Sequence, residues 1–162
     1  MSENRKISVA VIGLILVLLL FNVSVWQKMG ILSNGNFVLL EMAPVDPRSP
    51  MQGDYMELNY KATMNISTDS IPHKGYCIVR SVSGNLFEKV RFQENISPLG
   101  DNEIAISYSV HKGRIHIGSS TFFFQEGTGP LYDRAKYAGM RVSRKGQSVL
   151  VGLYDENQMR IR

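Results

Sequence analysis

The sequence predicts a mainly β protein: one N-terminal transmembrane helix followed by a compact β-rich extracytoplasmic domain with one short helix. Three observations support this fold class. Residues 7–26 carry no charged side chain and are almost all apolar. Several later segments alternate apolar and polar residues with a period of two, as strands with one buried face do. Lys112-Gly113 and Lys145-Gly146, which lie between such segments, are typical hairpin turns. The 162-residue length leaves room for one domain after the helix.

The uncharged run at residues 7–26 has the length of a membrane span. A helix that rises about 1.5 Å per residue needs roughly 20 apolar residues to cross the hydrocarbon layer. Within lipid the backbone must satisfy its own hydrogen bonds, which predicts a helix. Trp26 suits the interface at the far end. Because no polar residues alternate within the run, we favour a span over a buried core helix.

The same run also resembles the apolar part of a cleaved secretory signal. Cleavage needs small residues at the −3 and −1 positions, and residues 22–26 (Asn-Val-Ser-Val-Trp) offer no such pair. We therefore favour an uncleaved anchor. Arg5 and Lys6 precede the span, whereas Lys28 alone follows it closely. This bias predicts that residues 1–6 are cytoplasmic and that the remainder after the span is extracytoplasmic.

The rest of the chain divides into a linker at 27–36, which contains Gly30 and Gly35, and a β-rich domain at 37–162. Strands are expected at 37–42, 55–66, 76–82, 86–92, 104–110, 114–117, 140–144 and 148–154. Segment 55–66 alternates most clearly, with every second residue from Met56 to Ile66 apolar. One short helix is expected within 130–138, with Pro130 in its first turn and Gly139 ending it.

Charge and cysteine content exclude several classes of protein. The formal net charge is +4, but no basic run reaches the length of a nucleic-acid-binding patch. For the loose group Arg141, Arg144 and Lys145 we favour a solvated face over weak attraction to anionic lipid headgroups. The single Cys77 excludes an internal disulfide and is expected to be a small buried hydrophobe. His73, His111 and His116 are expected at the surface, with no metal site and no cofactor.

The most unusual segment is 41–60. Pro44, Pro47 and Pro50 preset the backbone and bar a helix, and Gly53-Asp54 is typical of a turn. One interpretation is a rigid connection between strands, with Asp46 or Asp54 accepting backbone N–H bonds and Arg48 pairing with one of them. The other is a preorganised loop that presents Asp46, Arg48 and Ser49 to a ligand or partner. The chemistry alone favours the structural interpretation.

Three blocks in this chain resemble a known family. Pro44-Val45-Asp46-Pro47-Arg48-Ser49, followed by Gly53-Asp54-Tyr55, Leu58 and Tyr60, is similar to the hallmark of the GDYXXLXY family of uncharacterised bacterial membrane-anchored proteins. Residues 123–129 (Phe-Phe-Gln-Glu-Gly-Thr-Gly) resemble a second family block, and residues 138–142 with Gly146 and 150–153 a third. The chain departs from the family pattern at Gln125, where proline is common, and at Pro50, where an apolar residue is common.

The resemblance implies an anchored extracytoplasmic domain in the bacterial inner membrane and no established activity. Members are often encoded beside a polytopic membrane protein, which implies an integral membrane partner. No small-molecule ligand is implied. The candidate binding residues are Asp46, Arg48, Ser49, Asp54, Tyr55, Tyr60 and Glu126. The candidate turn residues are Pro44, Pro47, Gly53, Gly127 and Gly129.

Two functions remain open. We favour a non-enzymatic accessory or assembly protein that uses segments 44–60 and 123–129 to bind a polytopic membrane protein. The alternative is an exported small-ligand-binding or signal-peptidase-like hydrolytic domain that uses Asp46, Arg48, Ser49 and Glu126. Signal peptidases place a serine nucleophile at the position that Val45 occupies here. Ser49 would need a desolvated lysine as its base, and Lys61, Lys74 and Lys89 are equally available in the sequence.

Overall fold

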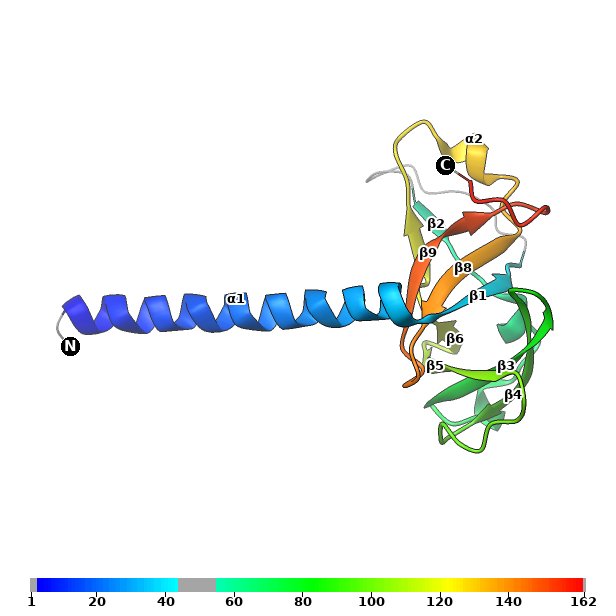
Figure 1. The fold of residues 1–162 in the computed structure, drawn as a ribbon, viewed down its shortest axis with the longest axis horizontal. Coiled ribbons are helices and arrows are strands. Elements are labelled where there is room, and N and C mark those ends of the chain that lie inside the picture. Colours follow the sequence, from blue (N-terminus) through cyan, green and yellow to red (C-terminus); the bar gives the residue numbers. More distant parts are fainter. Residues whose placement is uncertain (1–2, 44–54, 162) are drawn as a thin grey trace.

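The computed structural model describes residues 3–43 and 55–161. It confirms a mainly β protein in which one long N-terminal helix leads into a curled sheet domain with one further short α-helix, as Figure 1 shows. The long helix, α1 (Glu3–Asn34), projects away from the domain.

Helix α1 is long and apolar enough to cross a membrane between Ile7 and Asn34. Its large apolar side chains, from Ile7 to Leu32, are between 40% and 78% exposed, apart from a partly covered Ile31. It is therefore not the core helix of the domain. Residues 27–34, expected to be an irregular linker, continue the helix, because a single glycine in its interior costs only about 1 kcal/mol. The chain leaves the helix at Gly35, whose N–H donates to the Ile31 carbonyl at 2.8 Å.

Seven strands form the main sheet in the order β6–β5–β3–β4–β1–β8–β9. All neighbouring strands are antiparallel except β1 and β4, which are parallel. Their bounds are β1 Asn36–Glu41, β3 Lys74–Ser83, β4 Leu86–Gln93, β5 Glu103–His111, β6 Arg114–Ile117, β8 Tyr137–Val142 and β9 Ser148–Tyr154. Each was predicted within a few residues, because each has an apolar face and lies beside a turn.

The sheet curls until its two ends meet. The Gly146 carbonyl, in the β8–β9 turn, accepts from the backbone N–H of Ser107 on β5 at 2.8 Å and from its hydroxyl at 3.0 Å. Gly146 has φ +81°, and a Cβ there would collide with the Tyr76 ring, so only glycine allows this closure. The curled sheet encloses the apolar core, which includes Val38, Leu40, Cys77, Val79, Ile106, Ala138, Met140 and Leu153.

Segment 55–66 departs from the prediction of one long strand. Only β2 (Tyr55–Glu57) is a strand, and it pairs with a strand the sequence did not reveal, β7 (Thr121–Phe123). The alternation holds as far as Tyr60, after which the chain turns through the 3-10 helices η1 (Lys61–Thr63) and η2 (Thr68–Ser70). Thr63 ends the strand-like run because both its N–H and its hydroxyl bond to the Tyr60 carbonyl at 2.9 Å.

The short helix also differs from its prediction. Helix α2 (Gly129–Tyr132) has four residues and ends before Gly139, which lies in the middle of β8. A Cβ at Gly139 would strike the rings of Tyr154 and Phe37, so this glycine permits close packing of two aromatic side chains instead of ending a helix.

The path of β1 gives the domain two ends. Strand β1 starts beside α1 and runs away from it to Glu41, and β8 returns to Val142 beside Gly35. We call the region of Gly35, Val142 and the β8–β9 turn the helix-proximal end. The region of Glu41–Ala43 and Tyr137 is the helix-distal end.

Candidate functional site

The motif segment at 55–60 is held on both sides by backbone hydrogen bonds. The N–H of Leu58 donates to the Ser120 carbonyl, and the N–H of Ala43 donates to the Asn59 carbonyl, each at 2.8 Å. Tyr60 also forms an isolated bridge with Met42. The segment therefore fastens the end of β1 to the connection between β6 and β7. Its apolar members Met56 and Leu58 are buried in the core.

Tyr60 lies inside the domain. Its side chain is 2% exposed, and its hydroxyl donates to the Ser119 carbonyl at 2.8 Å. Burial raises the pKa of Tyr60 well above its usual range, so the hydroxyl stays a neutral donor. Predicted as a binding residue, Tyr60 has almost no surface to offer a partner and packs the core instead.

Tyr55 and Phe123 bring two of the predicted blocks together. They are direct partners across β2 and β7, with ring centroids 6.0 Å apart and planes at 49°. Phe123 is 72% exposed and Tyr55 is partly exposed. Behind them, Phe122 and Phe124 each lie about 5 Å from the Tyr132 ring, at 5.1 and 5.0 Å between centroids. The exposed aromatic pair Tyr55–Phe123 thus stands on a packed aromatic layer.

Glu126 is exposed in the turn that follows β7. Gly127 has φ +82°, a conformation that glycine adopts without strain, in keeping with its predicted turn role. The turn is closed by the Thr128 hydroxyl, which donates to the Gln125 carbonyl at 2.6 Å, and Gly129 begins α2. The remaining predicted residues lie outside the described part of the chain: Pro44, Asp46, Pro47, Arg48, Ser49, Gly53 and Asp54.

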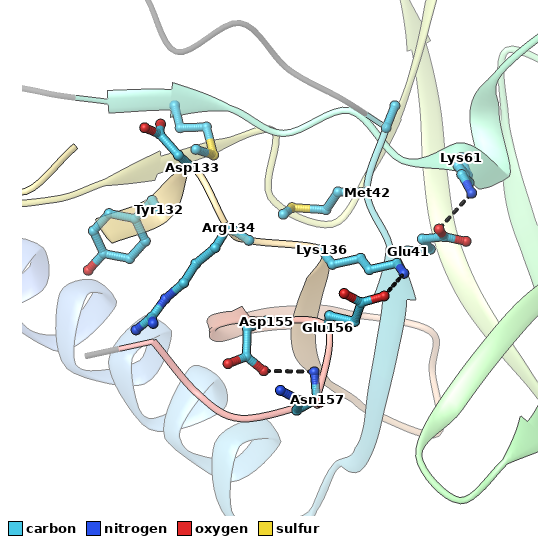
Figure 2. Close-up of a pocket in the computed structure, with 13 residues that line it drawn as sticks. Glu41, Met42, Lys61, Tyr132, Asp133, Arg134, Lys136, Asp155, Glu156 and Asn157 are labelled. Carbon is cyan, nitrogen blue, oxygen red and sulfur yellow. Dashed lines mark hydrogen bonds and ion pairs between the residues drawn. The ribbon is translucent and has the colours of Figure 1, made fainter. Parts of the chain in front are cut away.

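An open groove of about 920 Å³ lies at the helix-distal end (Figure 2). Its apolar lining includes Met42, Ala43 and Met56. Two ion pairs stand around it: Lys61 with Glu41 at 2.6 Å and Lys136 with Glu156 at 3.1 Å. The volume falls within the range of small-molecule sites, so the groove is the natural place to look for the alternative function.

The groove chemistry does not favour hydrolysis. The hydrogen bond with Glu156 raises the pKa of Lys136, which therefore keeps its proton, whereas a lysine base needs a lowered pKa. Asp155 is committed to its own turn, because one carboxylate oxygen accepts the N–H groups of Asn157 and Met159, both at 2.9 Å. Charges at this groove largely satisfy one another.

The family of the chain follows from a comparison with known protein families. The sequence model described as GDYXXLXY protein matches residues 17–153, most of the chain. The chain belongs to the GDYXXLXY family. No curated protein and no solved structure matches it significantly. In this member, the named motif residues divide between the core (Leu58 and Tyr60) and a partly exposed surface (Tyr55).

The charged cluster around Glu103 was not predicted from the sequence. The Glu103 side chain is 1% exposed and contacts Arg80 at 2.7 Å and Arg91 at 2.9 Å. It also accepts the N–H of Gly100 at 2.8 Å. The bonds from Arg91, Gly100 and Arg80, in that order, lower the pKa of Glu103 to about 2. The two arginines come from β3 and β4, so only the strand pairing reveals the cluster, which ties the 94–102 loop of this GDYXXLXY protein to its sheet.

Cys77 is buried as predicted, and burial raises the pKa of its thiol to about 12. Across residues 3–43 and 55–161, no three His, Cys, Asp or Glu side chains are grouped closely enough to hold a metal ion.

Proposed function

We propose that this protein is a membrane-anchored extracytoplasmic accessory or assembly protein that binds a polytopic membrane protein through the Tyr55–Phe123 pair. The observation that carries the proposal is the exposure of Phe123. A phenylalanine that is 72% exposed offers most of its ring to a partner, and the packed layer behind it fixes its backbone, so only side-chain entropy is lost on binding. Large aromatic side chains are enriched at the centres of protein interfaces.

The position of the pair supports the same proposal. Among the described residues, two family blocks separated by more than sixty positions meet at this pair. The aromatic layer behind the pair is packed, which holds the pair in one place for recognition. By contrast, four charged groups of the helix-distal groove are committed to two ion pairs, Lys61–Glu41 and Lys136–Glu156, which gives the ligand-binding alternative less support.

The anchoring part of the proposal rests on α1. Its exposed apolar surface needs lipid, and its last turns are joined to the domain instead of ending in a free linker. The helix runs without a break from the apolar run into the residues that contact the domain, which supports an uncleaved anchor. The bias of Arg5 and Lys6 supports a cytoplasmic N-terminus, with the domain on the outer face of the bacterial inner membrane.

The test is site-specific photo-crosslinking in intact membranes. A photoreactive phenylalanine analogue at position 123 is expected to give an adduct with a polytopic membrane protein, identified by mass spectrometry. The same analogue at Val82, which is also well exposed but lies on β3, is the matched control and is expected to give none. Phe123→Ser is expected to reduce co-purification of that protein in mild detergent at least tenfold, with unchanged circular dichroism. Equal adducts from both positions, or undiminished co-purification of Phe123→Ser, would refute the proposal.

A further inference from the structure

The helix-proximal end joins α1 to the β8–β9 hairpin. The Arg141 guanidinium donates to the Gly35 carbonyl at 2.9 Å and lies 5.5 Å above the Phe37 ring centre. A Cβ built on Gly35 would lie only 3.0 Å from the backbone nitrogen of Val142, so the two backbones are in close contact. The end of the helix and the end of β8 are therefore in direct contact.

Next to this joint, the start of β9 lies beside the last turns of α1. A small cavity of about 130 Å³ is lined on one side by Ser24, Gln27, Lys28 and Ile31 of the helix. On its other side it is lined by Gln147, Ser148 and Val149. The β8–β9 turn thus lies next to the segment where the predicted membrane span ends.

The turn itself is rigid. Ser143 N–H donates to the Gln147 carbonyl at 2.8 Å, and Gly146 N–H donates to the Ser143 carbonyl at 2.9 Å. The bonds from Ser107 to Gly146 fix the turn to β5. The exposed side chains at its tip are therefore presented at a fixed height relative to α1.

Those exposed side chains are positively charged. Arg144 and Lys145 lie in the turn and Lys28 lies on the neighbouring face of the helix, all of them exposed. In the described part of the chain none of the three forms an ion pair, whereas Lys61, Arg114 and Lys136 each pair with a glutamate. The three charges remain available for an external anion.

The height of this cluster matches the lipid headgroups. Residues 27–34 raise the domain by about 12 Å above Trp26 at 1.5 Å per residue. The headgroup layer is roughly 5–8 Å deep on each side of the hydrocarbon. Because Gln147 and Ser148, directly after the turn, share a cavity with Ser24 and Lys28, the long basic side chains of the turn lie within reach of that layer.

We propose that Lys28, Arg144 and Lys145 form a contact site for anionic phospholipid headgroups that fixes the orientation of the domain above the membrane. The inference rests on the anchoring of α1 in the proposed function, but not on the partner. Near an anionic surface each basic residue raises association about fivefold, so Arg144 and Lys145 together account for roughly 25-fold. The sequence alone favoured a solvated face for Arg144 and Lys145, because it does not show that the β8–β9 turn lies beside the end of the span.

The experiment uses the full chain in nanodiscs of phosphatidylcholine, with or without 30 mol% phosphatidylglycerol. A fluorophore on Gln147→Cys reports the distance to a quencher attached to lipid headgroups. The native Cys77 does not interfere because it is buried. Quenching is expected to be stronger in the anionic discs and to fall at high salt. In Arg144→Gln/Lys145→Gln it is expected to return to the level of the neutral discs.

Lys61→Gln/Lys89→Gln is the matched control, because it removes the same charge from a surface beside Glu41 at the helix-distal end. It is expected to leave the quenching unchanged. Quenching that is independent of lipid composition, or equally reduced in both double variants, would overturn the inference while leaving the crosslink at position 123 intact. Failure of the chain to enter nanodiscs would overturn the anchoring as well.

Discussion

Tyr60→Phe tests whether the last residue of the family motif serves the fold. The substitution removes only the hydroxyl that donates to the Ser119 carbonyl at 2.8 Å, across 59 positions of the chain. The ring remains and leaves no cavity. A stabilising role therefore predicts a loss of stability from the hydrogen bond alone.

The expected loss is about 1–2 kcal/mol. A net hydrogen bond contributes about 1 kcal/mol, and a buried acceptor left without a donor costs about 1–3 kcal/mol. Ser119 is only partly buried, so water can reach its carbonyl, and the upper end of the 1–3 kcal/mol range (about 3 kcal/mol) does not apply. An unfolding entropy of about 2.1 cal/mol/K per residue over roughly 130 residues converts this loss into a Tm lower by about 4–7 °C.

The assay is thermal unfolding of the full chain in detergent, followed by far-ultraviolet circular dichroism. Tyr55→Phe is the matched control from the same motif, because the Tyr55 hydroxyl makes no hydrogen bond to the described residues. The Tm of this variant is expected to shift by less than about 2 °C. Substitutions at such surface sites change the stability by less than about 0.5 kcal/mol. Equal shifts for the two variants, or no shift for Tyr60→Phe, would show that the buried hydroxyl does not hold β2 to the sheet.

Three further outcomes are expected. The pKa of Glu103 is about 2 when folded and about 4.3 when unfolded, so its contribution to stability is present above pH 4.3 and lost as the pH falls through 2. The difference in urea midpoint between the native chain and Glu103→Gln should therefore shrink from pH 6 to pH 3, and a constant difference would argue against the ionised carboxylate. Cys77 should react with a maleimide at pH 7.5 only after denaturation, and rapid labelling of the folded chain would contradict its burial. Gly139→Ala should cost about 1–3 kcal/mol in urea unfolding because its methyl group meets the Tyr154 ring, whereas Gly30→Ala, with open space around it inside α1, should not destabilise the chain and should add up to about 1 kcal/mol.

Local patterns in the sequence were enough to predict most of the fold. The apolar run at 7–26 and the alternating segments from Tyr76 to Ile117 follow rules that act over a few residues, and the structure has a helix and strands there. The prediction was wrong where contacts with distant parts of the chain determine the local structure. Alternation from Met56 to Ile66 suggested one strand, but a short run pairs only as far as its partner β7 extends, and β7 covers three residues. Gly139 suggested a helix end, but its small size serves the packing of Tyr154.

The candidate site was predictable in its parts but not in its arrangement. Nothing near Tyr55 in sequence indicates that Phe123 lies opposite, because that pairing depends on the whole path of β3 to β6 between them. The Glu103 cluster was missed for the same reason. Tyr60 was a candidate binding residue because it belongs to the block that resembles the family hallmark, although the alternation from Met56 onward already placed it on the apolar face, and its side chain is 2% exposed.

The motif has buried residues and a surface residue, and comparing substitutions of both kinds tests their roles more strictly than either kind alone. If Tyr60 and Leu58 set the shape of the segment and Tyr55 with Phe123 contacts a partner, then the two kinds of substitution must act differently. Variants at Tyr60 should lower stability and, through it, partner binding, and both should recover together at lower temperature. Phe123→Ser should lower partner binding at every temperature with no change in Tm, because an exposed ring adds little to the stability of the isolated domain. A family motif that combines both kinds of residue is therefore better understood as a surface and the support that holds it than as a single site.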